Sequence, residues 1–189
     1  MTSRQRLKKA LDHQEPDRVP IDFGSTAVTG LHVTCVENLR RHYGLEKRPV
    51  KVWEPYQMLG WLDEDLRAAM GLDVEGLYPR NNLFGFPNEG WREFRTPWGQ
   101  EVLVSKHFKT TVDGNGDLLL YPQGDLGASP RGRLPVGGFF FDTIVYQEKF
   151  EEQQLNPDDN LEEFTPIDDQ ALAHLRAEVL QRLDEHGGL

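Results

Sequence analysis

The sequence of 189 residues has one cysteine and no long apolar run, and both absences limit what the protein can be. Cys35 has no second cysteine with which to pair, so an intrachain disulfide framework is excluded and a reducing compartment is expected. No window approaches the 18 apolar residues that predict a membrane-spanning helix, and no apolar segment follows the basic residues near the N-terminus. We therefore expect a soluble, cytoplasmic protein.

Basic residues are scarce relative to acidic ones. The chain has 21 Lys and Arg against 31 Asp and Glu, which gives a formal net charge of −10. Proteins that bind nucleic acid use clustered Lys and Arg to neutralise phosphates, and anionic membranes attract the same residues. The charge balance therefore argues against nucleic acid and membranes as partners, and favours a small-molecule substrate.

The first residues predict a helix followed by a strand. Thr2 and Gln5 form a capping-box pattern at the start of a helix predicted over residues 3–13. Pro16 ends this helix, and the apolar run at 19–23 that follows predicts a strand. Helix, strand, loop and helix in this order are typical of the start of a β/α barrel, in which the loop after the strand carries the chemistry.

Alternating helical and extended patterns continue to residue 78. A helix is predicted over residues 28–43, a strand over 50–53, a helix capped by Asp63 and ended by Gly71, and a second core strand over 72–78. The apolar stripe of the helix over 28–43 recurs every four residues. It consists of Leu31, Cys35, Leu39 and Tyr43.

The second half of the chain changes character. Residues 84–146 are rich in Gly, Pro and aromatic residues and predict an antiparallel β-meander, which would be an insertion in a barrel. Residues 151–169 hold eight acidic residues and no Lys or Arg, and predict a solvated connector. Asp168 or Asp169 then caps a final helix that carries apolar residues three and four apart.

Several of these segments are similar to a known family. Residues 2–6 and 10–20 resemble the N-terminus of the uroporphyrinogen decarboxylase superfamily, which includes the decarboxylase and corrinoid- and zinc-dependent methyltransferases. The similarity is closest to the unassigned, methyltransferase-like branch. It continues through residues 50–52, 57–59, 63–65, 137–142 and 160–164. The resemblance implies one α/β domain over residues 1–189, a partial (β/α)8 TIM-barrel-like N-terminal half, since a complete barrel takes about 250 residues.

The resemblance also implies a chemistry. It would be methyl transfer that involves a corrinoid, or decarboxylation of a tetrapyrrole, so the substrate would be a tetrapyrrole or a methyl donor. The Arg-Gln-Ala-Gly-Arg-Tyr run that holds substrate carboxylates in the decarboxylase is absent after Val19-Pro20. The zinc-binding His and Cys set of the methyltransferases lacks a second cysteine here, so zinc–thiolate activation is not expected.

Five residues are candidates for the site. Asp22 is the first catalytic candidate because it would end the first barrel strand and point into the mouth; the alternative is that it caps the following loop. His32 is the second catalytic candidate, since it lies in the first turn of the next helix. Gly24, Gln57 and Arg80 are the substrate-binding candidates, through close backbone approach, an amide and a guanidinium respectively.

Two further groups of residues have competing interpretations. His32 and Cys35 have the H-x-x-C spacing of two zinc-ligand types, but two ligands do not make a site, and Cys35 on the apolar stripe predicts a buried, inert thiol. Gln57, Trp53, Tyr56 and Trp61 could together line a flat-ligand pocket, and core packing explains the two tryptophans equally well.

A second hypothesis belongs to a different functional class. The chain would be a non-catalytic binding or assembly module, or a truncated paralogue, which is completed by another subunit in a homo- or hetero-oligomer. Unpaired parallel strands and a half-covered core do not stay bare in water, so such a module would pair through its exposed edges. The oligomeric mass distinguishes the two hypotheses.

Overall fold

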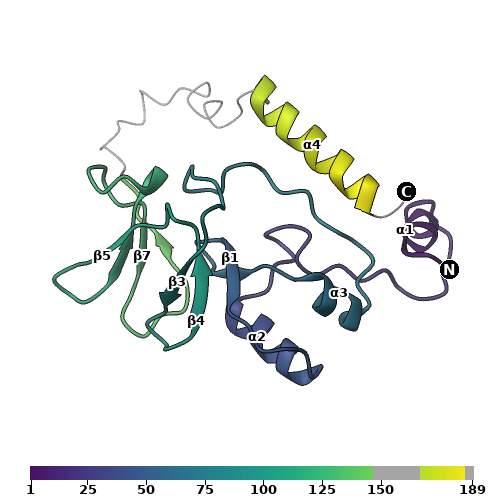
Figure 1. The fold of residues 1–189 in the computed structure, drawn as a ribbon, viewed down its shortest axis with the longest axis horizontal. Coiled ribbons are helices and arrows are strands. Elements are labelled where there is room, and N and C mark those ends of the chain that lie inside the picture. The colour runs from purple at the N-terminus through teal and green to yellow at the C-terminus, as the bar shows by residue number, and fades with distance from the viewer. Residues whose placement is uncertain (147–166, 186–189) are drawn as a thin grey trace, which may run out of the picture.

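The computed structural model describes residues 1–146 and 167–185 (Figure 1). Within these residues the chain is a mixed α/β structure of four α-helices and two four-stranded β-sheets, and no barrel closes. No helix in this part of the chain is long and apolar enough to cross a membrane. The helices are α1 (Ser3–Leu11), α2 (Val33–His42), α3 (Glu64–Met70) and α4 (Asp169–Glu185).

The first sheet is mixed, and its order is β2-β1-β4-β3. β1 and β4 are parallel, with Val50 opposite Val102 and Lys51 opposite Leu103. β2 is antiparallel to β1, and β3 is antiparallel to β4. The strands are β1 (Val50–Glu54), β2 (Leu59–Gly60), β3 (Arg92–Arg95) and β4 (Glu101–Val104).

The second sheet is antiparallel throughout, with the order β5-β6-β7-β8. A short 3-10 turn, η1 (Pro122–Gly124), lies between β6 and β7. Figure 1 shows this sheet next to β3 and β4, at the end of the molecule opposite to α1. The strands are β5 (Thr110–Val112), β6 (Leu118–Leu120), β7 (Gly132–Leu134) and β8 (Asp142–Thr143).

One hydrophobic core joins α2 to both sheets. Val102 and Val104 of β4 are fully buried because alternate residues of a strand face the same side. α2 contributes Val33 and Val36 to the same core. The other buried members are Val50, Val52, Met58, Leu62, Leu66, Phe84, Phe86, Phe108, Leu120, Leu134 and Phe141.

The prediction of two barrel strands at 19–23 and 72–78 is wrong, because neither segment forms a strand. Backbone hydrogen bonding between the two segments is confined to Ile21 and Asp73. Asp73 N donates to Ile21 O at 2.9 Å, and Ile21 N donates to the Asp73 carboxylate at 3.0 Å. A side-chain carboxylate thus occupies the place of a backbone carbonyl, and no ladder develops from this pair.

The helix predicted over residues 28–43 begins five residues later than expected. Val28 is 95% exposed and lies in a loop, and α2 starts at Val33. Val36 and Arg40 face inward, and the Arg40 guanidinium donates to Asp65 of α3 at 2.8 and 2.9 Å. Cys35 is exposed, so the prediction of a buried thiol is wrong.

Other predicted elements are confirmed. α1 begins with the expected capping box, in which Thr2 and Gln5 bond reciprocally. α3 follows Asp63, which is its N-cap residue but makes no side-chain capping hydrogen bond and pairs with Arg40 and Arg48 instead, and it ends at Gly71, which has a left-handed conformation with φ 66°. Antiparallel pairing within 84–146 is also confirmed, but the parallel pairing of β4 with β1 was not predicted.

The acidic connector predicted at 151–169 lies outside the described residues up to position 166. The helix that follows it is confirmed as α4. Its first turn is capped by Asp168, whose Oδ1 accepts from Ala171 N at 2.6 Å.

Gly76 lies close to the backbone of Ser25, in the loop that follows residues 19–23. A Cβ at this position would lie 2.1 Å from Ser25 O, so we expect Gly76→Ala to destabilise the protein by about 1–3 kcal/mol, measured by urea unfolding. Gly114→Ala is the control, because a Cβ there meets nothing within 4 Å, and we expect a change within about 0.5 kcal/mol. Equal effects of the two substitutions would contradict this packing.

Candidate functional site

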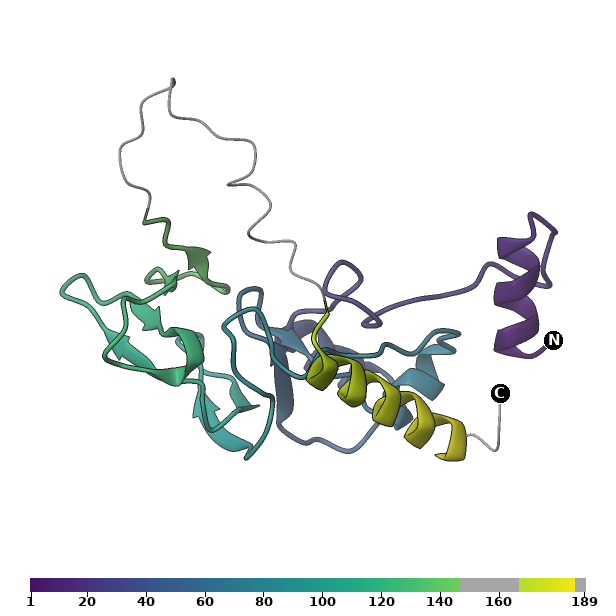
Figure 2. The same ribbon diagram turned by 90° about the horizontal axis from the view of Figure 1, so that it is seen from above.

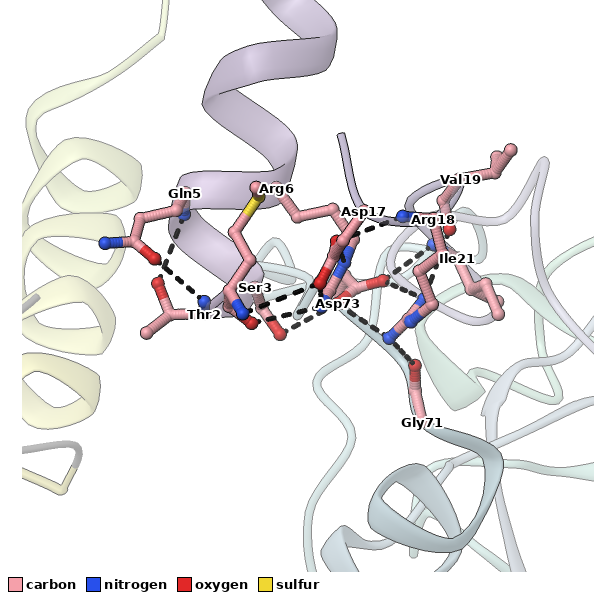
Figure 3. Close-up of polar contacts among 11 residues, drawn as sticks. Thr2, Ser3, Gln5, Arg6, Asp17, Arg18, Val19, Ile21, Gly71 and Asp73 are labelled. Atoms are coloured by element: carbon pink, nitrogen blue, oxygen red, sulfur yellow. Dashed lines mark hydrogen bonds and ion pairs between the residues drawn. The ribbon is translucent and has the colours of Figure 1, made fainter. Parts of the chain in front are cut away.

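The carboxylate of Asp73 holds the N-terminal segment to the rest of the protein. Its side chain has no exposed surface. It accepts hydrogen bonds from Ser3 Oγ (2.8 Å), Arg6 Nη1 (2.5 Å), Arg18 Nη1 (2.7 Å) and Ile21 N (3.0 Å) (Figure 3). Figure 2 shows α1 at the end of an extended segment, away from the sheets. One carboxylate therefore fixes both α1 and the segment that follows it.

Arg6 and Arg18 connect this carboxylate to its surroundings. Arg6 Nε and Nη2 donate to the two carboxylate oxygens of Asp17 at 2.7 and 2.9 Å, a bidentate pair. Arg18 Nη2 donates to Gly71 O at 3.0 Å, at the C-terminal end of α3. The network therefore ties together α1, residues 17–21 and the end of α3 (Figure 3).

The network favours the charged form of both carboxylates. The hydrogen bond from Arg6 holds the pKa of Asp17 well below its usual range. Burial alone would raise the pKa of Asp73, but the donors from Ile21, Ser3 and the two arginines lower it from 3.8 to about 2. Both groups are ionised at neutral pH and hold their arginine partners.

Asp22 closes the loop that it begins. Its Oδ2 accepts from Ser25 Oγ at 2.5 Å and from Thr29 Oγ1 at 3.3 Å, and its Oδ1 accepts from Ser25 N at 3.3 Å. Gly24, at φ 82°, belongs to the same loop, and its carbonyl accepts from Tyr78 OH at 2.5 Å. These are the contacts of the loop-capping alternative, and the catalytic role of Asp22 stays a prediction.

The space beside this loop is small. The cavity lined by Gly24, Trp61 and Tyr78 measures about 10 Å³, which is about the space of one water molecule. Tyr78 itself lies between two tryptophans, with its ring centroid 4.7 Å from those of Trp53 and Trp61. The tryptophans therefore pack on a protein ring rather than around a flat ligand.

His32 is the N-cap residue of α2. Its Nδ1 accepts from Thr34 N at 3.2 Å, and its Nε2 donates to Phe139 O at 2.9 Å in the matching tautomer. The ring lies 5.3 Å from that of Trp98, measured between centroids. Both ring nitrogens are occupied, and no group of three or more His, Cys, Asp or Glu side chains in the described residues could hold a metal ion.

The two remaining candidates are on the surface. Gln57 and Arg80 both have exposed side chains. The structure brings Asp22 and Gly24 into one loop, and it shows no direct contact among His32, Gln57 and Arg80 within residues 1–146 and 167–185. The binding roles of Gln57 and Arg80 stay predictions.

The sequence interpretation missed Glu54, an acidic residue at the carboxyl end of a parallel strand and directly before a proline. Glu54 is 2% exposed, and its two oxygens accept from Tyr56 N at 2.9 Å and Gln57 N at 2.8 Å. Burial raises the pKa of the Glu54 carboxyl, and the N–H groups of Gln57 and Tyr56 act in the opposite direction. Since both oxygens are used, this carboxylate closes the turn between β1 and β2.

The lowered pKa of Asp73 predicts a pH-dependent contribution to stability. A carboxyl group with a folded pKa near 2 stabilises the fold above the ordinary value of 3.8, and this contribution is lost as the pH falls through 2. We expect Asp73→Asn to lower the melting temperature by several degrees at pH 7, and the difference from wild type to shrink between pH 4 and pH 2.

The control for this measurement is Asp12→Asn, which removes an exposed ion pair with Lys8 on α1. We expect its melting temperature to stay within about 1 °C of wild type, since exposed pairs contribute little. A difference between wild type and Asp73→Asn that is the same at every pH would contradict the ionised network.

Comparisons of the chain with family models, with curated proteins and with solved structures find no match. The family resemblance therefore rests on the quoted sequence segments. The functional argument rests on the geometry of the chain itself.

Proposed function

We propose that this chain is an assembly module, a part of a uroporphyrinogen-decarboxylase-like β/α fold whose apolar surface is covered by another subunit. One observation carries the proposal, which is an apolar stripe on α4. Leu172 and Leu180 are each 56% exposed, and Val179 between them is 37% exposed. Residues seven and eight positions apart lie on one face of a helix, so the three side chains share a face, on which the exposed Arg176 lies between Leu172 and Leu180.

A different face of α4 binds the rest of the chain. His174 Nε2 donates to Tyr78 O at 3.2 Å, and Arg182 forms an ion pair with Glu75. Figure 1 shows α4 along one side of the molecule. The contacts of His174 and Arg182 anchor the helix, while Leu172 and Leu180 stay exposed. Single exposed leucines are normal on protein surfaces, but an apolar stripe on an anchored helix is typical of an interaction surface.

The resemblance supports the fold part of the proposal. Arg6, Asp17 and Arg18 lie within the two segments that resemble the superfamily, and all three join the network around Asp73. These motif residues have a structural task in this chain. The similarity at these residues therefore supports a shared fold more than it supports a shared reaction. β1 and β4 form one parallel pair, as neighbouring strands of a barrel do, although antiparallel β2 and β3 flank the pair on both sides.

A second copy of the chain is the partner that we propose, because most soluble oligomers are homo-oligomers and two-fold dimers are the commonest. By the resemblance, the assembled protein would decarboxylate a tetrapyrrole or transfer a methyl group with a corrinoid. Coproporphyrin and methylcobalamin are the probes for this chemistry. Either compound at 100 times its dissociation constant would stabilise the assembly by about 2.7 kcal/mol.

The proposed assembly predicts a measurable mass. We expect light scattering at about 50 µM to give twice the chain mass of 21.7 kDa. Leu172→Glu combined with Leu180→Glu places charges on the stripe and should return the protein to a monomer. The control is Leu126→Glu, at a site that is similarly exposed but lies in the connection between β6 and β7. A wild-type monomer, or equal dissociation of the control, would contradict the proposal.

A further inference from the structure

A second, larger cavity lies where three segments of the chain meet. Its volume is about 480 Å³, within the range of small-molecule sites. Tyr56 from the β1–β2 turn and Phe84 form one wall, with stacked rings 4.2 Å apart between centroids. Phe84 fits there because β7 has a glycine opposite it: a Cβ on Gly132 would lie 2.8 Å from Phe84 Cζ.

The polar side of the cavity comes from the connection between β6 and β7. Gln123, Asp125 and Arg131 line it. Arg131 donates its backbone N–H to Leu120 O at 2.9 Å, and its exposed guanidinium has no partner among residues 1–146 and 167–185. Asp125 Oδ1 accepts from Gly127 N at 2.8 Å, which leaves Oδ2 for a ligand. The cavity therefore offers one cation, one carboxylate oxygen and one amide beside an aromatic wall.

The position of the cavity in the fold is also typical of a binding site. Tyr56 lies just beyond the carboxyl end of β1, and His107 follows the carboxyl end of the parallel strand β4. The η1 turn rests on this second segment, since a Cβ on Gly124 would lie 2.5 Å from His107 O. Ligands of open α/β sheets bind outside the carboxyl ends of parallel strands.

Gln123 adds an independent observation. It has a left-handed backbone conformation, with φ 54°, that residues other than glycine rarely adopt. Its N–H donates to Phe84 O at 2.7 Å, which fixes this conformation and places the Gln123 side chain near Gly85. Backbone strain of this kind concentrates at ligand-binding sites.

From these observations we infer that the cavity binds a small planar aromatic carboxylate that also carries a hydrogen-bond donor on its ring. Arg131 binds the carboxylate, because its planar fork matches the two carboxylate oxygens. Tyr56 contacts the ring, supported from behind by the buried Phe84, and Asp125 accepts from the ring's hydroxyl or amino group. All of these residues belong to one copy of the chain, so the inference does not depend on the proposed assembly.

The test is calorimetric titration with 6-hydroxy-2-naphthoate, which has a carboxylate and, on the other ring, a hydroxyl that is free to donate. We expect saturable binding with one molecule per chain. Arg131→Gln should weaken binding about tenfold or more, because hydrogen bonds to charged groups are the strong ones. The matched control is Arg133→Gln, two residues along the same segment, where the arginine lies 3.9 Å from Asp117; it should bind within twofold of wild type.

Two further measurements complete the test. The neutral amide 6-hydroxy-2-naphthamide should bind about as weakly to wild type as the acid binds to Arg131→Gln. The Leu172→Glu and Leu180→Glu variant should bind the acid as wild type does, which separates this site from the assembly surface. The inference is overturned by absence of binding at 1 mM acid, by equal binding of acid and amide, or by equal losses in the Arg131 and Arg133 variants.

Discussion

The buried carboxylate of Asp73 is the interaction on which the N-terminal part of the structure depends. It gathers donors from α1, from Arg18 and from the backbone of Ile21, and thereby joins segments that are remote in sequence. Charge-assisted hydrogen bonds are strong where water is excluded, and they require that every partner is in place. α1 is consequently placed by polar contacts, while α2 and the sheets are placed by the hydrophobic core.

The region held by the polar network and the region held by the hydrophobic core differ in the polar groups that they leave for a ligand. Near the Asp73 network, the polar groups of Asp22 and Gly24 are used within the protein, and the space beside them holds about one water molecule. At the other end, the connection between β6 and β7 leaves Asp125 and Arg131 facing a much larger cavity. Of the residues that the sequence singled out, Tyr56 lines the proposed ligand site, while Asp22, Gly24 and His32 do not. The proposed assembly surface on α4 is formed by other residues.

The sequence predicted elements whose signals are local. The capping box at Thr2, the strand predicted at 50–53 and the helix end at Gly71 depend on neighbouring residues, and all are present. The strands at 19–23 and 72–78 were wrong because a side chain, that of Asp73, took the place of a ladder partner. The parallel pairing of β4 with β1 and the cavity at Arg131 depend on residues far apart in sequence, for which a single sequence carries no signal. Cys35 is exposed because the inward face of α2 runs through Val33, Val36 and Arg40 and not through the predicted stripe.

The most direct test of the central claim is the distance between α1 and the core. The chain has one cysteine, the exposed Cys35 on α2, and Lys9 on α1 is also exposed. Spin labels on Cys35 and on a Lys9→Cys variant allow this distance to be measured by pulsed electron paramagnetic resonance at pH 7. The account predicts one narrow distance distribution, which broadens when Asp73→Asn is added. A broad distribution in the protein with Asp73 intact would contradict the claim that this carboxylate fixes α1.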